Sequence, residues 1–115
     1  MELQGQSKLL RIFVGETDKI GHQLLYEAII MAAKEKGLAG GTVLKGIMSF
    51  GASSRIHVAR LIELSEDLPI VIEIIDHDEK IAGFLIIVND LFEKCGRGGL
   101  ITVEKVDVLY YKPKK

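Results

Sequence analysis

Residues 70–92 read IVIEIIDHDEKIAGFLIIVNDLF and join the most apolar run of the chain to its clearest helical pattern. The first six residues, Ile70–Ile75, are almost entirely apolar, which is typical of a buried central strand. Asp76, with Glu79 three residues later, is predicted to cap the start of a helix. This helix has one apolar stripe at helical spacing, which consists of Ile81, Phe84, Leu85, Val88, Leu91 and Phe92.

A single charge, Glu73, interrupts the apolar strand. A carboxylate that is buried without a partner is strongly destabilising, so Glu73 must find a partner or lie at an edge or a subunit boundary. Two interpretations follow. Glu73 is either a group that binds a ligand or one half of a structural ion pair, and the second interpretation is slightly favoured.

The chain before this stretch begins with a strand and a helix. Leu9–Val14 is apolar and bounded by Gly15, which predicts a largely buried strand. From His22 to Lys36 apolar residues recur at helical spacing without a proline. Gly37 follows where a left-handed C-terminal cap is expected, so a helix is predicted to end there.

Three more segments have the apolar pattern of strands, and they are Thr42–Met48, Ile56–Leu64 and Leu100–Tyr111. In the last segment the apolar parity changes, which predicts a bulge or break near Glu104 and Lys105. The resulting order is the split β-α-β pattern of ferredoxin-like α+β folds, with an antiparallel sheet and two helices on one face. Because the strands are apolar on both parities, the uncovered face is predicted to pack against another copy of the chain.

Composition narrows the class of protein. The chain has 115 residues and a net charge of −1, which predicts one domain and argues against a nucleic-acid partner. We expect a polar leader at 1–8, a domain at 9–111 and a basic tail at 112–115. The single Cys95 and the absence of a secretory pattern favour the cytoplasm.

The three histidines have no metal-ligand spacing, so no metal site is expected.

Two glycine-containing stretches are candidate loops for ligand binding. Gly46–His57 holds small residues, two serines and Arg55, which can donate to a phosphate or carboxylate. The simpler interpretation is a connection whose glycines and serines only turn the chain. Gly96–Gly99 has the same ambiguity, because Gly96 is also expected as a helix cap while Arg97 and the backbone amides suit an anion.

Several runs together resemble one known family, and they are Leu9–Glu16, Gly37–Gly46, Phe50–His57 and Ser65–Glu73. They are similar to the family called domain of unknown function 190, over nearly the whole chain. That family is considered similar to the PII nitrogen-regulatory signalling proteins. PII proteins are ferredoxin-like trimers that bind adenine nucleotides in clefts between subunits, so the resemblance implies a homotrimer.

The resemblance also implies a site for ADP, ATP or AMP, bound as a ligand and not as a prosthetic group. It places Gly96–Gly99 on the phosphates, Gly40–Thr42 and Glu73 around the base or ribose, and the central loop over the nucleotide. The implied set is Gly40, Gly41, Thr42, Gly46, Phe50, Gly51, Ser53, Arg55, Glu73, Gly96, Arg97, Gly98 and Gly99. Binding would change the loop that an unknown protein partner meets, and membrane transporters are one candidate class of partner.

The chain also departs from the PII pattern. Ser49–Arg55 has no tyrosine, so regulation by uridylylation is not expected, and Leu100 and Ile101 stand where PII proteins carry an aspartate and a lysine. The alternative is a small enzyme on a ferredoxin-like fold that acts on a phosphorylated substrate. An acylphosphatase needs an arginine cradle after the first strand, yet Gly15–Asp18 is acidic. No catalytic residue is therefore assigned, and a signalling protein is preferred to an enzyme.

Overall fold

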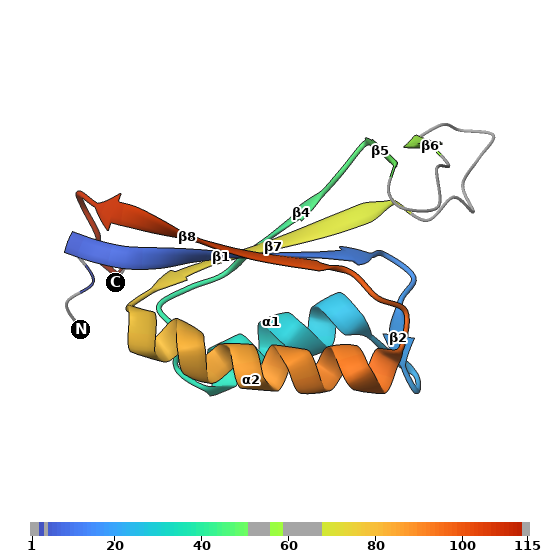
Figure 1. The fold of residues 1–115 in the computed structure, drawn as a ribbon, viewed down its shortest axis with the longest axis horizontal. Helices are drawn as coiled ribbons and strands as arrows, with labels where there is room; N and C mark the ends of the chain where they lie inside the picture. Colours follow the sequence, from blue (N-terminus) through green and yellow to red (C-terminus); the bar gives the residue numbers. More distant parts are fainter. Residues whose placement is uncertain (1–2, 4, 51–55, 59–67, 114–115) are drawn as a thin grey trace.

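The computed structural model describes residue 3 and residues 5–50, 56–58 and 68–113. An antiparallel four-stranded sheet with strand order β4-β7-β1-β8 lies over two helices (Figure 1). In chain order the elements are β1 (Gly5–Gly15), β2 (Lys19–Ile20), β3 (Gln23–Leu24), α1 (Leu25–Glu35), β4 (Thr42–Lys45), β5 (Met48–Phe50), β6 (Ile56–Val58), β7 (Pro69–Asp76), α2 (Asp78–Cys95) and β8 (Leu100–Val108).

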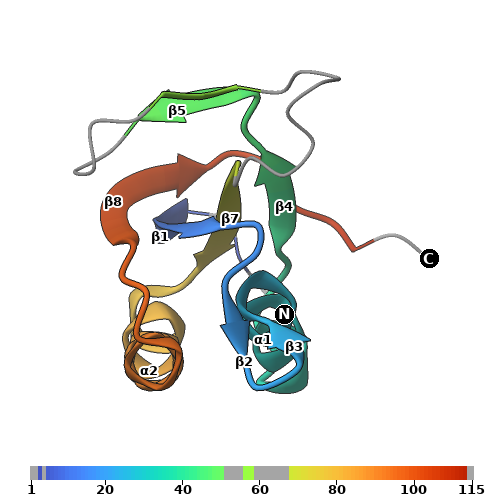
Figure 2. The same ribbon diagram turned by 90° about the vertical axis from the view of Figure 1, so that its right-hand side faces the viewer.

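Both helices cover the same face of the sheet, as Figure 2 shows from the end of the molecule. β7 and β1 are the two inner strands, so the prediction of a central strand over Ile70–Ile75 is confirmed. The α+β class, the antiparallel sheet and the pair of helices on one face are confirmed as well. We call the sheet surface on the other side, away from the helices, the open face.

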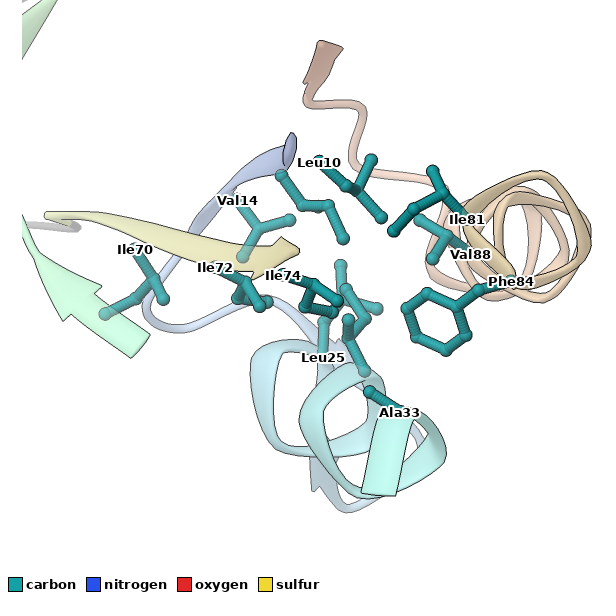
Figure 3. Close-up of a cluster of buried hydrophobic side chains, with 12 residues drawn as sticks. Leu10, Val14, Leu25, Ala33, Ile70, Ile72, Ile74, Ile81, Phe84 and Val88 are labelled. Atoms are coloured by element: carbon teal, nitrogen blue, oxygen red, sulfur yellow. The ribbon is translucent and has the colours of Figure 1, made fainter. Parts of the chain in front are cut away.

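The core fills the space between the sheet and the helices (Figure 3). Every second residue of β1 and β7 points into this space, because side chains alternate along a strand. One apolar stripe of each helix meets them. The buried members of the core are Leu10, Ile12, Val14, Ile70, Ile72 and Ile74 from the sheet, Leu25, Ile29 and Ala33 from α1, and Ile81, Phe84 and Val88 from α2.

The start of α2 differs from the prediction, whereas its end agrees. His77 is the N-cap residue, and no side chain makes a capping bond there. Asp76 is the last residue of β7, and its Oδ2 accepts a hydrogen bond from the backbone N–H of Ala39 at 2.9 Å. One oxygen of the carboxylate thus holds the turn between α1 and β4, and the other accepts a hydrogen bond from the N–H of His77 at 2.7 Å, so Asp76 precedes the N-cap position and does not occupy it. Gly96 ends the helix with a φ of 74°, as predicted.

The predicted bulge in the last strand is wrong. β8 pairs with β1 without interruption from Leu100 to Val108. The apolar residues change parity because different faces of this regular strand are covered near its two ends. On the helix side, Lys105 and Asp107 face a hollow beyond the start of α2, while on the open face Val108 is half-buried beside Leu3.

Several element boundaries also differ from the predictions. β1 begins at Gly5, within the predicted polar leader, because it pairs with β8 from that residue onward. α1 begins at Leu25, after the short β2–β3 hairpin, and not at His22. The left-handed glycine predicted after this helix is confirmed, since Gly37 has a φ of 77°.

The chain between β4 and β7 leaves the main sheet. β4 ends at Lys45, and β5 and β6 pair only with each other in a separate ribbon. The ribbon projects away from the helices (Figures 1 and 2). The predicted strand Ile56–Leu64 is therefore limited to Ile56–Val58 among the described residues, and the rest of it lies outside them.

Replacement of Asp76 tests the link between its carboxylate and the α1–β4 turn. Asp76 is 0% exposed, so Asp76→Ala removes a buried carboxylate that accepts from the N–H groups of Ala39 and His77, and both N–H groups lose this acceptor. We expect the free energy of unfolding to fall by about 1–3 kcal/mol in urea titrations. Asp78→Ala is the matched control, because its carboxylate is exposed and forms a surface ion pair with Lys8 at 3.6 Å. Equal losses for the two variants would contradict the assigned role.

Candidate functional site

Glu73 lies on the open face, where it forms an ion pair. The Nε of Arg11 donates to Glu73 Oε2 at 2.9 Å, and the Nη1 of Arg11 donates to Glu104 Oε1 at 2.9 Å. The hydrogen bond with Glu73 raises the pKa of Arg11, desolvation opposes the change, and the charge of Glu104 adds to it. The structural pair predicted for Glu73 is thus present. It does not exclude a ligand, because Glu73 also borders a pocket.

This pocket, which we call the edge pocket, lies beside β4 and has a volume of about 290 Å³. Four of the predicted binding residues come together in it. β4 is in register with β7, so Thr42 lies directly opposite Glu73, and the turn before β4 adds two glycines. The residues that line the pocket are Leu3, Ala39, Gly40, Gly41, Thr42, Glu73, Ile75, Val108, Tyr110 and Tyr111.

Tyr110 and Tyr111 line the edge pocket although sequence reasoning assigned them no role. They follow β8 on the far edge of the sheet, and Tyr111 reaches the α1–β4 turn, where its hydroxyl donates to the carbonyl of Ala39 at 3.3 Å. The sequence signal that could have pointed to them is that two of the three tyrosines of the chain are adjacent. Their relation to β4 depends on how the chain crosses the sheet, which the local pattern did not show.

The two glycines of the turn have different constraints. A Cβ on Gly41 would lie 2.6 Å from the end of the Ile30 side chain, so an alanine here would require this side chain of α1 to shift. A Cβ on Gly40 would meet nothing within 4 Å, and its φ is not in the left-handed region. The packing of the chain therefore does not require glycine at position 40.

Gly96–Gly99 lies at the other edge of the sheet, between α2 and β8 (Figure 1). Gly96 and Gly98 have left-handed φ values of 74° and 80°, and both are exposed beside the exposed Arg97. Gly99 has a structural reason, because a Cβ there would lie 2.6 Å from the carbonyl oxygen of Phe13. Within one chain, the structure does not bring this turn to the edge pocket.

The remaining predicted residues belong to the central segment. Gly46 donates its N–H to the carbonyl of Pro69 at 2.8 Å, and a Cβ would lie 2.5 Å from the Pro69 ring, so packing explains this glycine. Phe50 is 72% exposed at the end of β5. The other three predicted residues, Gly51, Ser53 and Arg55, lie outside the described residues.

The loop after β1 is where the enzyme alternative requires an arginine cradle, and its acidic side chains are engaged in other contacts. Its Asp18 carboxylate accepts a hydrogen bond from the N–H of Gly15 at 2.9 Å, and Glu16 forms an ion pair with Lys45 at 3.0 Å. Within the described residues, no three His, Cys, Asp or Glu side chains are grouped to hold a metal ion. Among these residues, neither helix has the length and hydrophobicity to span a membrane.

Comparison with known proteins identifies the family. The model of the family DUF190, described as "Uncharacterized ACR, COG1993", matches residues 7–108. The chain belongs to the DUF190 family. A UPF0166 protein of Aquifex aeolicus is 40% identical over 105 residues, which cover 91% of this DUF190 chain and 95% of that protein. A UPF0166 protein of Methanocaldococcus jannaschii is 34% identical over 98 residues, which cover 85% and 87%.

Solved structures with the same fold include CPII of Thiomonas intermedia K12, a nitrogen-regulatory PII-like protein. CPII with ADP and bicarbonate bound has a TM-score of 0.66 and 19% identity, over 90% of the DUF190 chain and 88% of CPII. CPII with ADP, AMP and bicarbonate bound has a TM-score of 0.67 at the same identity and coverage. At this identity the likeness shows the fold, which is PII-like.

Two glycine variants test which of these glycines the packing of the chain requires. Gly99→Ala is expected to lower the free energy of unfolding by about 1–3 kcal/mol, because its methyl group collides with the Phe13 backbone and the Phe92 ring. Gly40→Ala is expected to leave stability unchanged or raise it by about 0.4–1 kcal/mol. Thermal and urea denaturation measure both. A large loss in Gly40→Ala would show that the fold itself needs this glycine.

Proposed function

We propose that this DUF190 protein is a PII-like signalling or adaptor protein that binds an adenine nucleotide between copies of the chain. One observation carries the proposal. Gly40, Gly41, Thr42 and Glu73, predicted to surround the base or ribose, line a single pocket at one edge of the sheet. The PII-like fold and the nucleotides bound to CPII add support.

The charges of the two predicted half-sites favour different parts of a nucleotide. The edge pocket contains the carboxylate of Glu73, which Arg11 bridges to Glu104. This cluster of one cation and two anions keeps a net negative charge and disfavours phosphate, while the carboxylate oxygens can accept hydrogen bonds from ribose hydroxyls. At the Gly96–Gly99 turn, Arg97 and a series of backbone amides favour an anion. The base and ribose therefore bind at the β4 edge, and the phosphates bind at the β8 edge.

A complete site then requires at least two copies of the chain, because the half-sites lie on opposite edges of one sheet. The open face is suited to such an assembly. It exposes apolar side chains, including Leu44 and Leu100, and its most buried charge, Glu73, is already paired with Arg11. We propose a homotrimer in which each copy gives one half-site to each neighbour.

The signal is passed on by the β5–β6 ribbon and the chain around it. Met48 and Phe50 are exposed large apolar residues on this ribbon, which projects from the sheet, and Ile47, just before it, is exposed as well. Nucleotide contacts at the neighbouring Gly46 and at Phe50 favour one arrangement of this segment over others, which shifts its equilibrium. A protein partner recognises that arrangement, and membrane transporters remain the candidate class. The protein is not an enzyme in this proposal.

Calorimetric titration with ADP, ATP and AMP tests the nucleotide site directly. Arg97→Ala is expected to weaken ADP binding by about 1–3 kcal/mol, because a charge-assisted bond to phosphate is lost. The matched control is Lys94→Ala, because Lys94 is a cation in the last turn of α2, three residues before Arg97, and is paired with Asp90 at 3.0 Å. Absence of heat and of a thermal shift at millimolar nucleotide would refute the proposed function. Equal effects of the two variants would refute the role of Arg97.

Sedimentation equilibrium tests the assembly. The wild-type protein is expected at three times the mass of the 12.7 kDa chain. Leu44→Glu is expected to lower this mass, because it puts a charge on the open face that has no partner in the interface. Ile86→Glu is the control, since Ile86 is 73% exposed on the outer side of α2. A wild-type monomer would contradict the assembly, and an unchanged mass for Leu44→Glu would contradict the choice of face.

A further inference from the structure

The segment after β8 crosses the open face from one edge of the sheet to the other. β8 is the edge strand beside β1 and ends at Val108. Three residues later, the hydroxyl of Tyr111 bonds to the carbonyl of Ala39, immediately before β4 on the opposite edge. Figure 2 shows the chain passing from β8 toward β4. This crossing brings two aromatic rings to the edge pocket.

The two tyrosines have different roles in the wall of the pocket. Tyr111 is half-buried and held by its bond to Ala39 at 3.3 Å. Tyr110 is 78% exposed, so the packing of the chain leaves most of its ring uncovered. A single exposed aromatic residue is ordinary on a protein surface. Here, however, its neighbour fixes it at the rim of a pocket that four predicted binding residues also line.

The size of the edge pocket limits what it can hold. Its volume of about 290 Å³ is at the lower end of the range for pockets that enclose whole small ligands. Arg11 bridges the carboxylates of Glu73 and Glu104, so this cluster of one cation and two anions keeps a net negative charge, which disfavours phosphate. The pocket is therefore matched to the flat, uncharged part of a nucleotide, and the group on its rim that fits such a surface is an aromatic ring.

We infer that Tyr110 is the platform on which the nucleobase stacks, while the Glu73 carboxylate accepts and the Thr42 hydroxyl donates or accepts hydrogen bonds at the base or ribose. The inference deepens the proposed function and rests on it. It assigns base recognition to a residue in the segment after β8, outside the set predicted from the sequence. Stacking requires the ring and not the hydroxyl, so a phenylalanine at this position is expected to bind the base as the tyrosine does.

Titration with ADP of the wild type, Tyr110→Ala, Tyr110→Phe and Leu109→Ala tests the inference. Tyr110→Ala is expected to raise the Kd by about 5- to 150-fold, the range that loss of one stacked base produces. Tyr110→Phe is expected to keep most of the affinity. Leu109→Ala, a neighbouring exposed residue that does not line the pocket, is expected to bind like the wild type. All variants should keep the melting temperature of the wild type.

Tyrosine fluorescence gives a second readout that a merely structural role would not change. The chain has three tyrosines and no tryptophan, so its emission comes from tyrosine alone. ADP is expected to quench this emission in the wild type and in Leu109→Ala, and most of the quench should disappear in Tyr110→Phe although ADP still binds.

Three outcomes would overturn the inference, and they differ in whether the proposed function is overturned with it. Wild-type affinity in Tyr110→Ala, or a full quench in Tyr110→Phe, would remove Tyr110 from base recognition and leave the proposed function intact. Failure of the wild-type protein to bind any of ADP, ATP and AMP would remove both the inference and the proposed function.

Discussion

The alternation of side chains along β1 and β7 is the constraint on which the rest of the structure depends. On one side of these inner strands, isoleucine, leucine and valine close the core against α1 and α2. On the other side, the same alternation forces Arg11 and Glu73 to lie opposite each other in adjacent strands. The ion pair that they form is therefore a consequence of register. It makes a charged residue compatible with the most apolar strand in the chain.

The antiparallel strand order then determines where ligand groups can lie. β4 and β8 are the two edges, so the turns that precede them are separated by the width of the sheet. One turn is tied down by the buried Asp76, and the other is built from left-handed glycines at the end of α2. A ligand that uses both turns must join two copies of the chain. The proposed function and the proposed assembly thus follow from one feature of the topology.

Local patterns predicted the elements that bury a regular apolar face. The stripe of α2, the strand at Ile70–Ile75 and the glycines that end both helices could all be read from spacing. Errors occurred where a residue serves a distant partner. Asp76 has the sequence context of a helix cap, yet its carboxylate bonds to Ala39, 37 positions away. The parity change in β8 resembled a bulge because the covering of each face changes along the strand, which no local rule detects.

The amino-acid sequence by itself determined the family, the α+β class and the set of glycines at which to look for a ligand, because these depend on short-range periodicity and on runs of matching residues. Only the tertiary structure decided which candidates meet. It joined Gly40–Thr42 to Glu73 through strand register, explained Gly46 and Gly99 by packing, and brought Tyr110 and Tyr111 across the sheet. The physical reason is that contacts between distant segments are fixed by strand pairing and chain crossing, and neither leaves a signature in adjacent residues.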